Sequence, residues 1–282
     1  MKRRILIYGA GVIGSIYGGL LSKAGHHVTL AARNNRLFEL QEKGLLIKRI
    51  NQSQSEKINV EIVDCNQIYD YYDYVFVTLR NEQVNSALPV LSGINSKCFV
   101  FMVNNPLGYS KWITVLSKEK VLPAFPGSLG KIDDGTVIYE IVSKFIQPTT
   151  IGEPDGKITD RLKELKNILK ESGFSVSISK NIESWQKSHV AMVAPLGDVI
   201  YYDGGNNYTV ANNNKAIQQM NLALKENFIF LKKSGIGIEP FKLNIFIFLP
   251  IFILNPLMKL VYKTKWAETV ISNHALNAKQ EM

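Results

Sequence analysis

Cysteine and histidine are scarce in this chain of 282 residues, which contains 2 Cys and 4 His. Cys65 and Cys98 lie in or beside apolar runs, and they do not have the spacing of metal ligands. The sequence therefore predicts neither a metal site nor a disulfide framework. No signal sequence stands before the first apolar run, so we expect a protein of the reducing cytoplasm.

A long basic tract is also missing, although the formal net charge is +9. The 33 lysines and arginines are spread along the chain, so we expect no nucleic-acid partner. The same positive field would steer a small anionic substrate and a phosphorylated cofactor toward the protein. The chain has no internal repeat, and its length and composition are those of a folded protein with two domains.

One segment is apolar enough to raise the question of a membrane, namely residues 243–258. Two asparagines and two prolines interrupt this segment, and two lysines follow it. Prolines break a helix and asparagines are costly in hydrocarbon. These interruptions favour a buried helix pair or a subunit interface, such as that of a homodimer, over membrane association.

A glycine-rich turn stands between two apolar runs near the amino terminus. It comprises Gly9, Ala10, Gly11, Val12, Ile13 and Gly14. Residues 15–24 carry an apolar helical face, and Gly25 stands where a helix would end. In such a turn Gly9 makes the sharp bend, Gly11 lets the backbone approach a pyrophosphate, and Gly14 lets the helix pack on the sheet. The pattern predicts a dinucleotide bound at the start of a helix.

The residue after the second apolar run decides which dinucleotide is expected. An acid there would bind the ribose hydroxyls of NAD, but the chain has Arg33. Cationic and amide side chains follow it, and no carboxylate appears before Glu39. The sequence favours NADP as the cofactor, with Arg33 on its 2'-phosphate. The alternative is that Arg33 is a solvated residue at the start of the next helix.

Strand-like and helical segments alternate over the first 180 residues. Helices are expected at 34–43, 82–91 and 160–172, and strands at 45–50, 58–63, 73–79, 98–103 and 174–178. Segments 136–145 and 149–152 read as additions to the sheet that form an antiparallel hairpin. This alternation predicts an α/β fold with a doubly wound Rossmann-type parallel sheet.

From residue 181 onward the pattern is helical, apart from a loop at 203–207. We therefore expect two domains, an NADP-binding domain at 1–180 and an all-helical substrate and dimerisation domain at 181–282. Ligands of doubly wound sheets lie beyond the carboxyl ends of the strands. The glycine turn, Arg33, Arg80 and Asn104 all follow predicted strands, so we expect them to converge on one crevice.

Several motifs occur in this chain in an order that resembles the ketopantoate reductase (2-dehydropantoate 2-reductase) family. They are the glycine turn, Arg33, residues 77–80, Asn104, residues 151–156 and the pair Trp185 and Lys187. The resemblance implies that NADPH gives a hydride to the carbonyl of a 2-keto acid. It also implies that Lys187 donates the proton. This agrees with the chemistry, because a cation stabilises the charge that develops on the carbonyl oxygen.

The resemblance implies that Asn104 contacts cofactor and substrate, with the adjacent Asn105 as a rival. It also places Arg80 near the cofactor phosphate, where the family usually has lysine. Either Asn104 or Arg80 could instead be a turn residue.

The chain departs from the family pattern at its substrate residues. Ala191 and Ala194 stand where the family commonly has asparagines. His189 points away from Lys187 on a regular helix, so it either binds substrate from an irregular first turn or packs inside the helical domain, and packing is favoured. His274 and Glu281 are candidates for the family's substrate helix, and the chain stops where related proteins usually continue.

The leading hypothesis is an NADPH-dependent reductase that converts 2-dehydropantoate to pantoate or acts on a related acid, as in pantothenate biosynthesis. The loss of two amides predicts that 2-dehydropantoate is a poor substrate. A non-catalytic NADP-binding protein with a helical interaction domain, and a hydroxy-acid dehydrogenase that uses NAD, are the alternatives.

Overall fold

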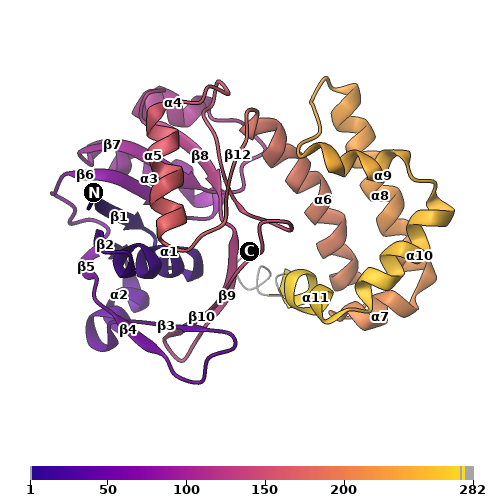
Figure 1. Cartoon of the computed structure of the whole chain (residues 1–282), viewed down its shortest axis with the longest axis horizontal. Coiled ribbons are helices and arrows are strands. Elements are labelled where there is room, and N and C mark those ends of the chain that lie inside the picture. Colours follow the sequence, from indigo (N-terminus) through magenta and orange to yellow (C-terminus); the bar gives the residue numbers. More distant parts are fainter. Residues whose placement is uncertain (1, 274, 277–282) are drawn as a thin grey trace. The chain divides into compact units, whose positions relative to one another are not determined.

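The computed structural model describes residues 2–273 and 275–276. The chain divides into two compact units, Met1–Ile182 and Glu183–Met282. Figure 1 shows the helices and strands of both units, labelled where there is room.

The first unit is built on an eight-stranded sheet. Its strands in spatial order are β12 (Val176–Ile178), β11 (Thr149–Ile151), β8 (Val121–Phe125), β7 (Ser96–Met102), β6 (Tyr72–Val77), β1 (Arg4–Tyr8), β2 (His27–Ala32) and β5 (Glu61–Asp64). The six strands from β8 to β5 are parallel, and the order reverses between β1 and β6. This is the predicted doubly wound Rossmann-type sheet, and the reversal is the point where such sheets bind ligands.

Helices connect the parallel strands. They are α1 (Val12–Lys23), α2 (Asn34–Lys43), α3 (Asn81–Gly93), α4 (Ser110–Leu116) and α5 (Asp160–Glu171). In α5 the Thr159 hydroxyl caps the first turn, and leucines at 162, 165 and 169 are fully buried. Gly25 has φ of +89° just after α1, so it ends that helix as the sequence predicts.

A second, four-stranded sheet corrects two expectations. It comprises β4 (Glu56–Ile58), β3 (Leu45–Arg49), β10 (Thr136–Ile141) and β9 (Ser128–Asp133). The strand expected at 58–63 is divided, because β4 ends at Ile58 in this sheet and β5 begins at Glu61 in the other. The hairpin expected between 136–145 and 149–152 is wrong, because β10 pairs with β9 and β11 joins the large sheet.

The turn between β9 and β10 explains the second error. Thr136 lies opposite Asp133, so only Asp134 and Gly135 connect the strands, and both have positive φ. An Asp-Gly pair in that conformation matches the twist of a two-residue hairpin. The sequence therefore contained the signal for this hairpin. The Asp-Gly turn decides the partner of β10, although the apolar residues at 149–152 also have the pattern of a strand.

The second unit is helical, as expected. Its elements are α6 (Ile182–Tyr202), α7 (Asn207–Asn212), α8 (Asn214–Lys233), η1 (Phe241–Asn244), α9 (Ile245–Phe248), α10 (Ile251–Tyr262), α11 (Lys265–Ala267) and a π-helical turn at Glu268–Ser272. Leu224, Phe228 and Leu254 are among its buried core residues. The buried Asn207 side chain donates to the Tyr262 carbonyl oxygen at 2.8 Å, which ties α7 to the end of α10.

The apolar segment 243–258 is divided between three short elements. α9 ends before Leu249 and Pro250, and α10 begins after them. Among the residues that the structure describes, no helix has the length and apolar character needed to cross a membrane. The expectation of a buried helix pair is met only in part, since Leu254 and Met258 are buried but Phe252 and Leu257 are exposed.

Candidate active site

The glycine turn joins β1 to α1 beside the reversal of strand order. Gly9 has φ of +114°, which favours glycine, and a Cβ there would lie 3.0 Å from the Thr78 carbonyl oxygen. A Cβ on Gly14 would lie 1.9 Å from the Gly9 carbonyl oxygen. Only glycine therefore lets α1 pack so closely on the turn. The structural roles predicted for these two glycines are confirmed.

Gly11 has different surroundings from the other two glycines. It is the N-cap of α1, with φ of −71°, and a Cβ built on it meets no described atom within 4 Å. Protein packing therefore does not require glycine here, whereas close approach of a phosphate would. The first turn of α1 has no acidic residue, so its positive dipole end is not neutralised locally. These residues fit the pyrophosphate of a dinucleotide.

Two side chains to which the sequence assigned no role hold the glycine turn in place. The Thr78 hydroxyl, just after β6, donates to the Gly9 carbonyl oxygen at 2.6 Å. Arg36 on α2 donates through Nε to the Ala10 carbonyl oxygen at 3.1 Å and forms an ion pair with Glu39. The sequence could have indicated Thr78, because it follows a strand that neighbours β1 in a doubly wound sheet.

Arg33 lies where the sequence predicts, directly after β2 as the N-cap of α2. It is exposed and makes no ion pair with the residues described. Burial raises the pKa of the Tyr8 phenol, and the Arg33 charge acts in the opposite direction. The cation therefore lies close to the end of β1 as well as the end of β2. An exposed guanidinium at this corner suits a phosphate group.

A carboxylate lies nearer to this corner than the sequence suggested. Asp64 is paired in register with Ala32, the residue before Arg33, because β5 runs alongside β2. One Asp64 oxygen, Oδ1, accepts hydrogen bonds from the backbone and side-chain amides of Asn66, at 2.8 and 2.9 Å. Along the chain, no carboxylate appears before Glu39. In the folded protein, however, Asp64 lies beside the end of β2, so the expectation of a corner without a carboxylate is wrong.

Arg80 also follows a strand of the sheet. It is the exposed N-cap of α3, and its backbone amide donates to Gln83 Oε1 at 3.3 Å. β6 is next to β1, so Arg80 and the glycine turn share one edge of the sheet. Its contact with a cofactor phosphate stays a prediction.

The two asparagines that follow β7 have different surroundings. Asn105 is 3% exposed, accepts from the Leu107 amide at 3.0 Å and donates to the Gly108 carbonyl oxygen at 2.7 Å. Its side chain therefore builds the loop. Asn104 Oδ1 is buried and has no hydrogen-bond partner among the described residues. A buried acceptor without a partner is costly, so Asn104 is the better candidate to meet a ligand donor.

Lys187 lies on α6 in the second unit, with its side chain 24% exposed. Its Nζ donates to Glu183 Oε1 at 2.5 Å, one helical turn earlier. Opposite charges four residues apart on a helix attract, so Glu183 restrains the ammonium group. Glu183 was not identified from the sequence, although this spacing was visible there.

The residues around Lys187 bear on the predicted substrate site. The His189 ring stacks on Trp185, with centroids 5.2 Å apart and planes 6° apart. This contact is what packing within the helical part requires, and a substrate role for His189 stays a prediction. The Ala191 carbonyl oxygen accepts from the Asn227 side chain of α8 at 3.1 Å. Ala194 is exposed. Because positions 191 and 194 are both alanine, α6 offers no side-chain amide at either position.

Segment 151–156, part of the family resemblance, has a structural role in the first unit. Glu153 is 3% exposed and accepts from the Arg161 and Thr159 side chains. Arg161 also donates to the Val121 carbonyl oxygen at 3.1 Å. The buried ion pair therefore ties the chain after β11 to the start of β8 and to α5.

His274 and Glu281 lie outside the described residues, so their proposed substrate contacts stay predictions. Within residues 2–273 and 275–276, no three His, Cys, Asp or Glu side chains are grouped as ligands of a metal ion.

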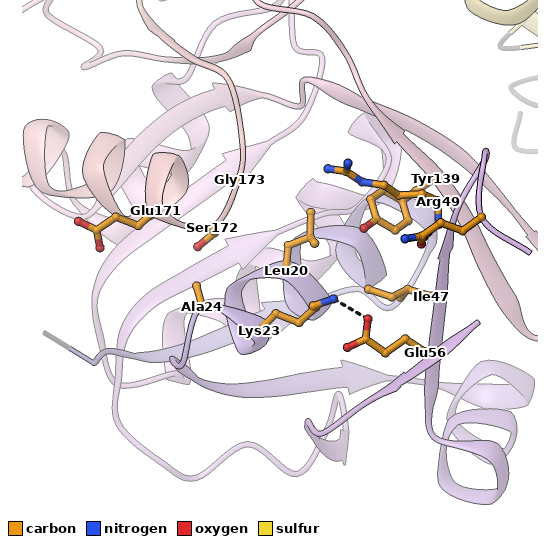
Figure 2. Close-up of a pocket in the computed structure, with 11 residues that line it drawn as sticks. Leu20, Lys23, Ala24, Ile47, Arg49, Glu56, Tyr139, Glu171, Ser172 and Gly173 are labelled. Atoms are coloured by element: carbon orange, nitrogen blue, oxygen red, sulfur yellow. Dashed lines mark hydrogen bonds and ion pairs between the residues drawn. The ribbon is translucent and has the colours of Figure 1, made fainter. Parts of the chain in front are cut away.

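An open depression of about 380 Å³ lies elsewhere in the first unit (Figure 2). Its lining includes Lys23 and Ala24 at the carboxyl end of α1, where Lys23 pairs with Glu56 at 2.5 Å. The glycine turn is at the opposite end of this helix, about 18 Å away by helix geometry. The depression is therefore separate from the predicted cofactor site.

Comparisons with known proteins find a matching family model and several relatives. The family model described as "Ketopantoate reductase PanE/ApbA" matches residues 5–152. The 2-dehydropantoate 2-reductase of Pyrococcus horikoshii is 25% identical over 211 residues, which cover 72% of this chain and 65% of that protein. The chain therefore spans less than two thirds of that relative. The enzyme of the same name from Aquifex aeolicus is 22% identical over 83% of this chain and 74% of its own length.

Solved structures with the same fold include two oxidoreductases. A D-mandelate dehydrogenase with NADH and anilino(oxo)acetate has a TM-score of 0.75 at 16% identity, covering 95% of this chain and 82% of that one. A putative ketopantoate reductase from Ralstonia solanacearum has a TM-score of 0.73 at 16% identity, covering 95% and 87%.

Proposed function

The chain belongs to the ketopantoate reductase PanE/ApbA family, and on this premise we propose that it reduces the keto group of a small 2-keto acid with NADPH. The product is the corresponding 2-hydroxy acid. The substrate is 2-dehydropantoate or a related acid, which would place the reaction in or near pantothenate biosynthesis. The names of the Pyrococcus and Aquifex relatives support this reaction class.

The first unit supplies the cofactor-binding residues in this proposal. The amides at the start of α1 hold the pyrophosphate, and the open space at Gly11 admits it. Arg33 binds the 2'-phosphate, and Arg80 adds positive charge at the same edge. When bound, NADPH supplies the hydride. Thr78 and Arg36 keep the turn in its binding conformation through the carbonyl groups of Gly9 and Ala10.

Two side chains act on the substrate in this proposal. Asn104 orients the nicotinamide and the substrate, because its buried Oδ1 needs a donor. Lys187 stabilises the negative charge that develops on the carbonyl oxygen and then donates a proton to it from Nζ. Glu183 holds the ammonium group in place, and the partial exposure of Lys187 lets solvent return the proton.

The observation that carries the proposal is the difference between the two adjacent amides. Asn105 satisfies its side chain within the loop, whereas Asn104 has a buried oxygen with no partner. A protein that bound only the nucleotide phosphates would not need such an acceptor at this strand end.

Oxidation of NADPH with a panel of 2-keto acids tests the proposal. We expect turnover by the wild type and a loss of about 100-fold or more in kcat for Lys187→Ala, the usual contribution of a general acid. Lys215→Ala, on the exposed start of α8, serves as a matched control and should keep full activity. Binding of NADPH without turnover of any 2-keto acid would refute the reductase and support a non-catalytic NADP-binding protein.

The substrate and the cofactor each have a specific alternative. Because α6 has alanines at 191 and 194, we propose that 2-dehydropantoate is turned over poorly, which ordinary turnover in the same panel would contradict. The position of Asp64 beside the end of β2 favours NAD as the rival cofactor. A lower KM for NADH than for NADPH would establish that rival.

The remaining assignments also belong to this proposal. We place the enzyme in a reducing cytoplasm because both cysteines are buried and unpaired. The two-domain assignment, with cofactor and substrate roles divided near residue 180, and the homodimer remain predictions. Light scattering of the purified chain tests the homodimer.

A further inference from the structure

Helix α10 has two apolar faces. Leu254, Met258 and Tyr262 recur every four residues and are buried in the core of the second unit. The opposite face carries Phe252, Pro256 and Leu260, which are also spaced four residues apart, and all three are exposed. A helix on the surface of a globular protein usually has polar residues on its outer face. The outer face of α10 therefore lacks the polar surface expected next to water.

The two elements that precede α10 in the chain also carry exposed apolar side chains. η1 contributes Phe241, and α9 contributes Ile245 and Phe248, all of them exposed. We define the α9–α10 face by its exposed apolar side chains: Phe241, Ile245, Phe248, Phe252, Ile253, Leu257 and Leu260. Figure 1 shows α9 and α10 beside α8 in this unit. So many large apolar side chains exposed on neighbouring segments of one unit are typical of a surface that another body covers.

The charges of this segment have one sign. Residues 241–267 contain lysines at 242, 259, 263 and 265 and no aspartate or glutamate. Lys232, at the end of α8, lies with its Nζ 5.5 Å from the Phe248 ring centroid. Glu239 and Glu268 flank the segment, and Glu268 accepts a hydrogen bond from the Tyr208 hydroxyl at 3.0 Å. The α9–α10 face is thus apolar with a cationic border.

We propose that the α9–α10 face binds the surface of an anionic phospholipid bilayer. Aromatic and aliphatic side chains on one helix face, bordered by lysines, are the pattern of helices that lie in the plane of a membrane interface. The apolar side chains enter the boundary between headgroups and acyl chains, and the lysines meet the lipid phosphates. The two prolines in this segment do not oppose this mode, because no helix has to span the bilayer.

The charge distribution favours lipid over a second copy of this chain. In a symmetric dimer on this face, the lysines of each copy would meet a segment of the other copy whose charged side chains are all cationic. Like charges brought together repel, and the segment offers no carboxylate to compensate them. An anionic bilayer supplies the missing negative charge.

Sedimentation of the whole protein with lipid vesicles tests the proposal. We expect binding to vesicles of equal phosphatidylcholine and phosphatidylglycerol, and binding about tenfold weaker to phosphatidylcholine alone. Raising the salt concentration should weaken binding to the mixed vesicles. The double variant Phe252→Gln with Leu257→Gln should bind them about tenfold or more weakly. Lys263→Gln with Lys265→Gln should weaken binding to the mixed vesicles only.

The matched control is Phe145→Gln, in the first unit. Phe145 and Phe252 are both 76% exposed, and Lys144 Nζ lies 4.9 Å from the Phe145 ring centroid, so the control also changes an exposed aromatic ring of a cationic surface. The control should bind vesicles as the wild type does. Thermal unfolding of each variant verifies folding, and the exposed substitutions should leave the midpoint unchanged.

Three results would overturn the proposal. The first is a wild type that does not sediment with phosphatidylglycerol vesicles. The second is unchanged binding by the Phe252 and Leu257 double variant. The third is light scattering in which that variant converts a dimer to a monomer while no form of the protein binds lipid, because the face would then join two copies of this chain.

Discussion

Two glycines of the same turn are expected to fail in opposite ways when changed to alanine. Gly11→Ala adds a methyl group that meets no described atom within 4 Å, at a φ of −71° that alanine adopts readily. Restricting the unfolded chain stabilises a protein by about 0.4–1 kcal/mol. Gly11 is also the N-cap of α1, where alanine is less favourable than glycine by a similar amount, so the two effects should nearly cancel. The same methyl group occupies the space where the pyrophosphate approaches. We therefore expect a stable protein with NADPH affinity reduced about tenfold or more, which corresponds to about 1.4 kcal/mol.

Gly14→Ala should have the reverse balance. Its methyl group would lie 1.9 Å from the Gly9 carbonyl oxygen and 2.6 Å from the Thr78 hydroxyl. The Gly9 carbonyl group and the Thr78 hydroxyl are hydrogen-bonded to each other, so neither can move away from the methyl group independently. Overpacking typically costs about 1–3 kcal/mol, and this site should lie at the upper end of that range. Cofactor binding should also weaken, because α1 must shift away from the turn.

Urea unfolding and NADPH titration by fluorescence measure the two effects separately. We expect a nearly unchanged unfolding free energy with weak binding for Gly11→Ala, and a clear loss of unfolding free energy for Gly14→Ala. Gly93→Ala is a suitable control, because that glycine also has open surroundings but lies at the end of α3. Wild-type NADPH affinity in Gly11→Ala would refute close approach of the pyrophosphate to this backbone.

Other expectations concern single side chains. Arg33→Ala should raise the KM for NADPH about tenfold and leave that for NADH unchanged, and equal weakening of both cofactors would contradict its phosphate role. Glu183→Gln should lower kcat and alter its pH profile. The unfolding free energy should stay within about 0.5 kcal/mol of the wild-type value, since ion pairs at the protein surface stabilise little. Glu226→Gln on α8 is the control. Burial raises the pKa of the Cys98 thiol from 9.0 to about 12, so the folded protein should react with a thiol reagent at pH 8 far more slowly than the unfolded protein. The same shift means that Cys98 contributes stability below about pH 9 that is lost as the pH rises toward 12, which urea unfolding across that range would show.

The sequence predicts the part of the fold that depends on local pattern. The glycine turn, the helix at 34–43 and the central strands follow from short motifs and apolar periodicity, and the structure has them close to the expected positions. The pairing of strands does not follow in the same way. Segments 136–145 and 149–152 both have the pattern of strands, and the Asp134-Gly135 turn decides that β10 turns back on β9.

The residues of the candidate site also differ in how far the sequence predicts them. Residues at strand ends, such as Arg33 and Asn104, can be predicted from the sequence because the strand that precedes each of them can be predicted. Asp64 and Thr78 reach the same edge through neighbouring strands, so their relation to the glycine turn depends on strand order. The choice between Asn104 and Asn105 also depends on hydrogen bonds that no spacing records.

The loop after β7 has a consequence for mutagenesis. Removing the Asn105 side chain breaks two hydrogen bonds that shape the backbone, so its activity loss would be indirect and would be accompanied by a lower melting temperature. Removing the Asn104 side chain deletes an oxygen that bonds nothing in the described chain, so its loss would occur in a protein of normal or improved stability. Alanine scanning by activity alone would score the neighbours as equals, whereas a melting curve for each would separate a scaffold from a ligand contact.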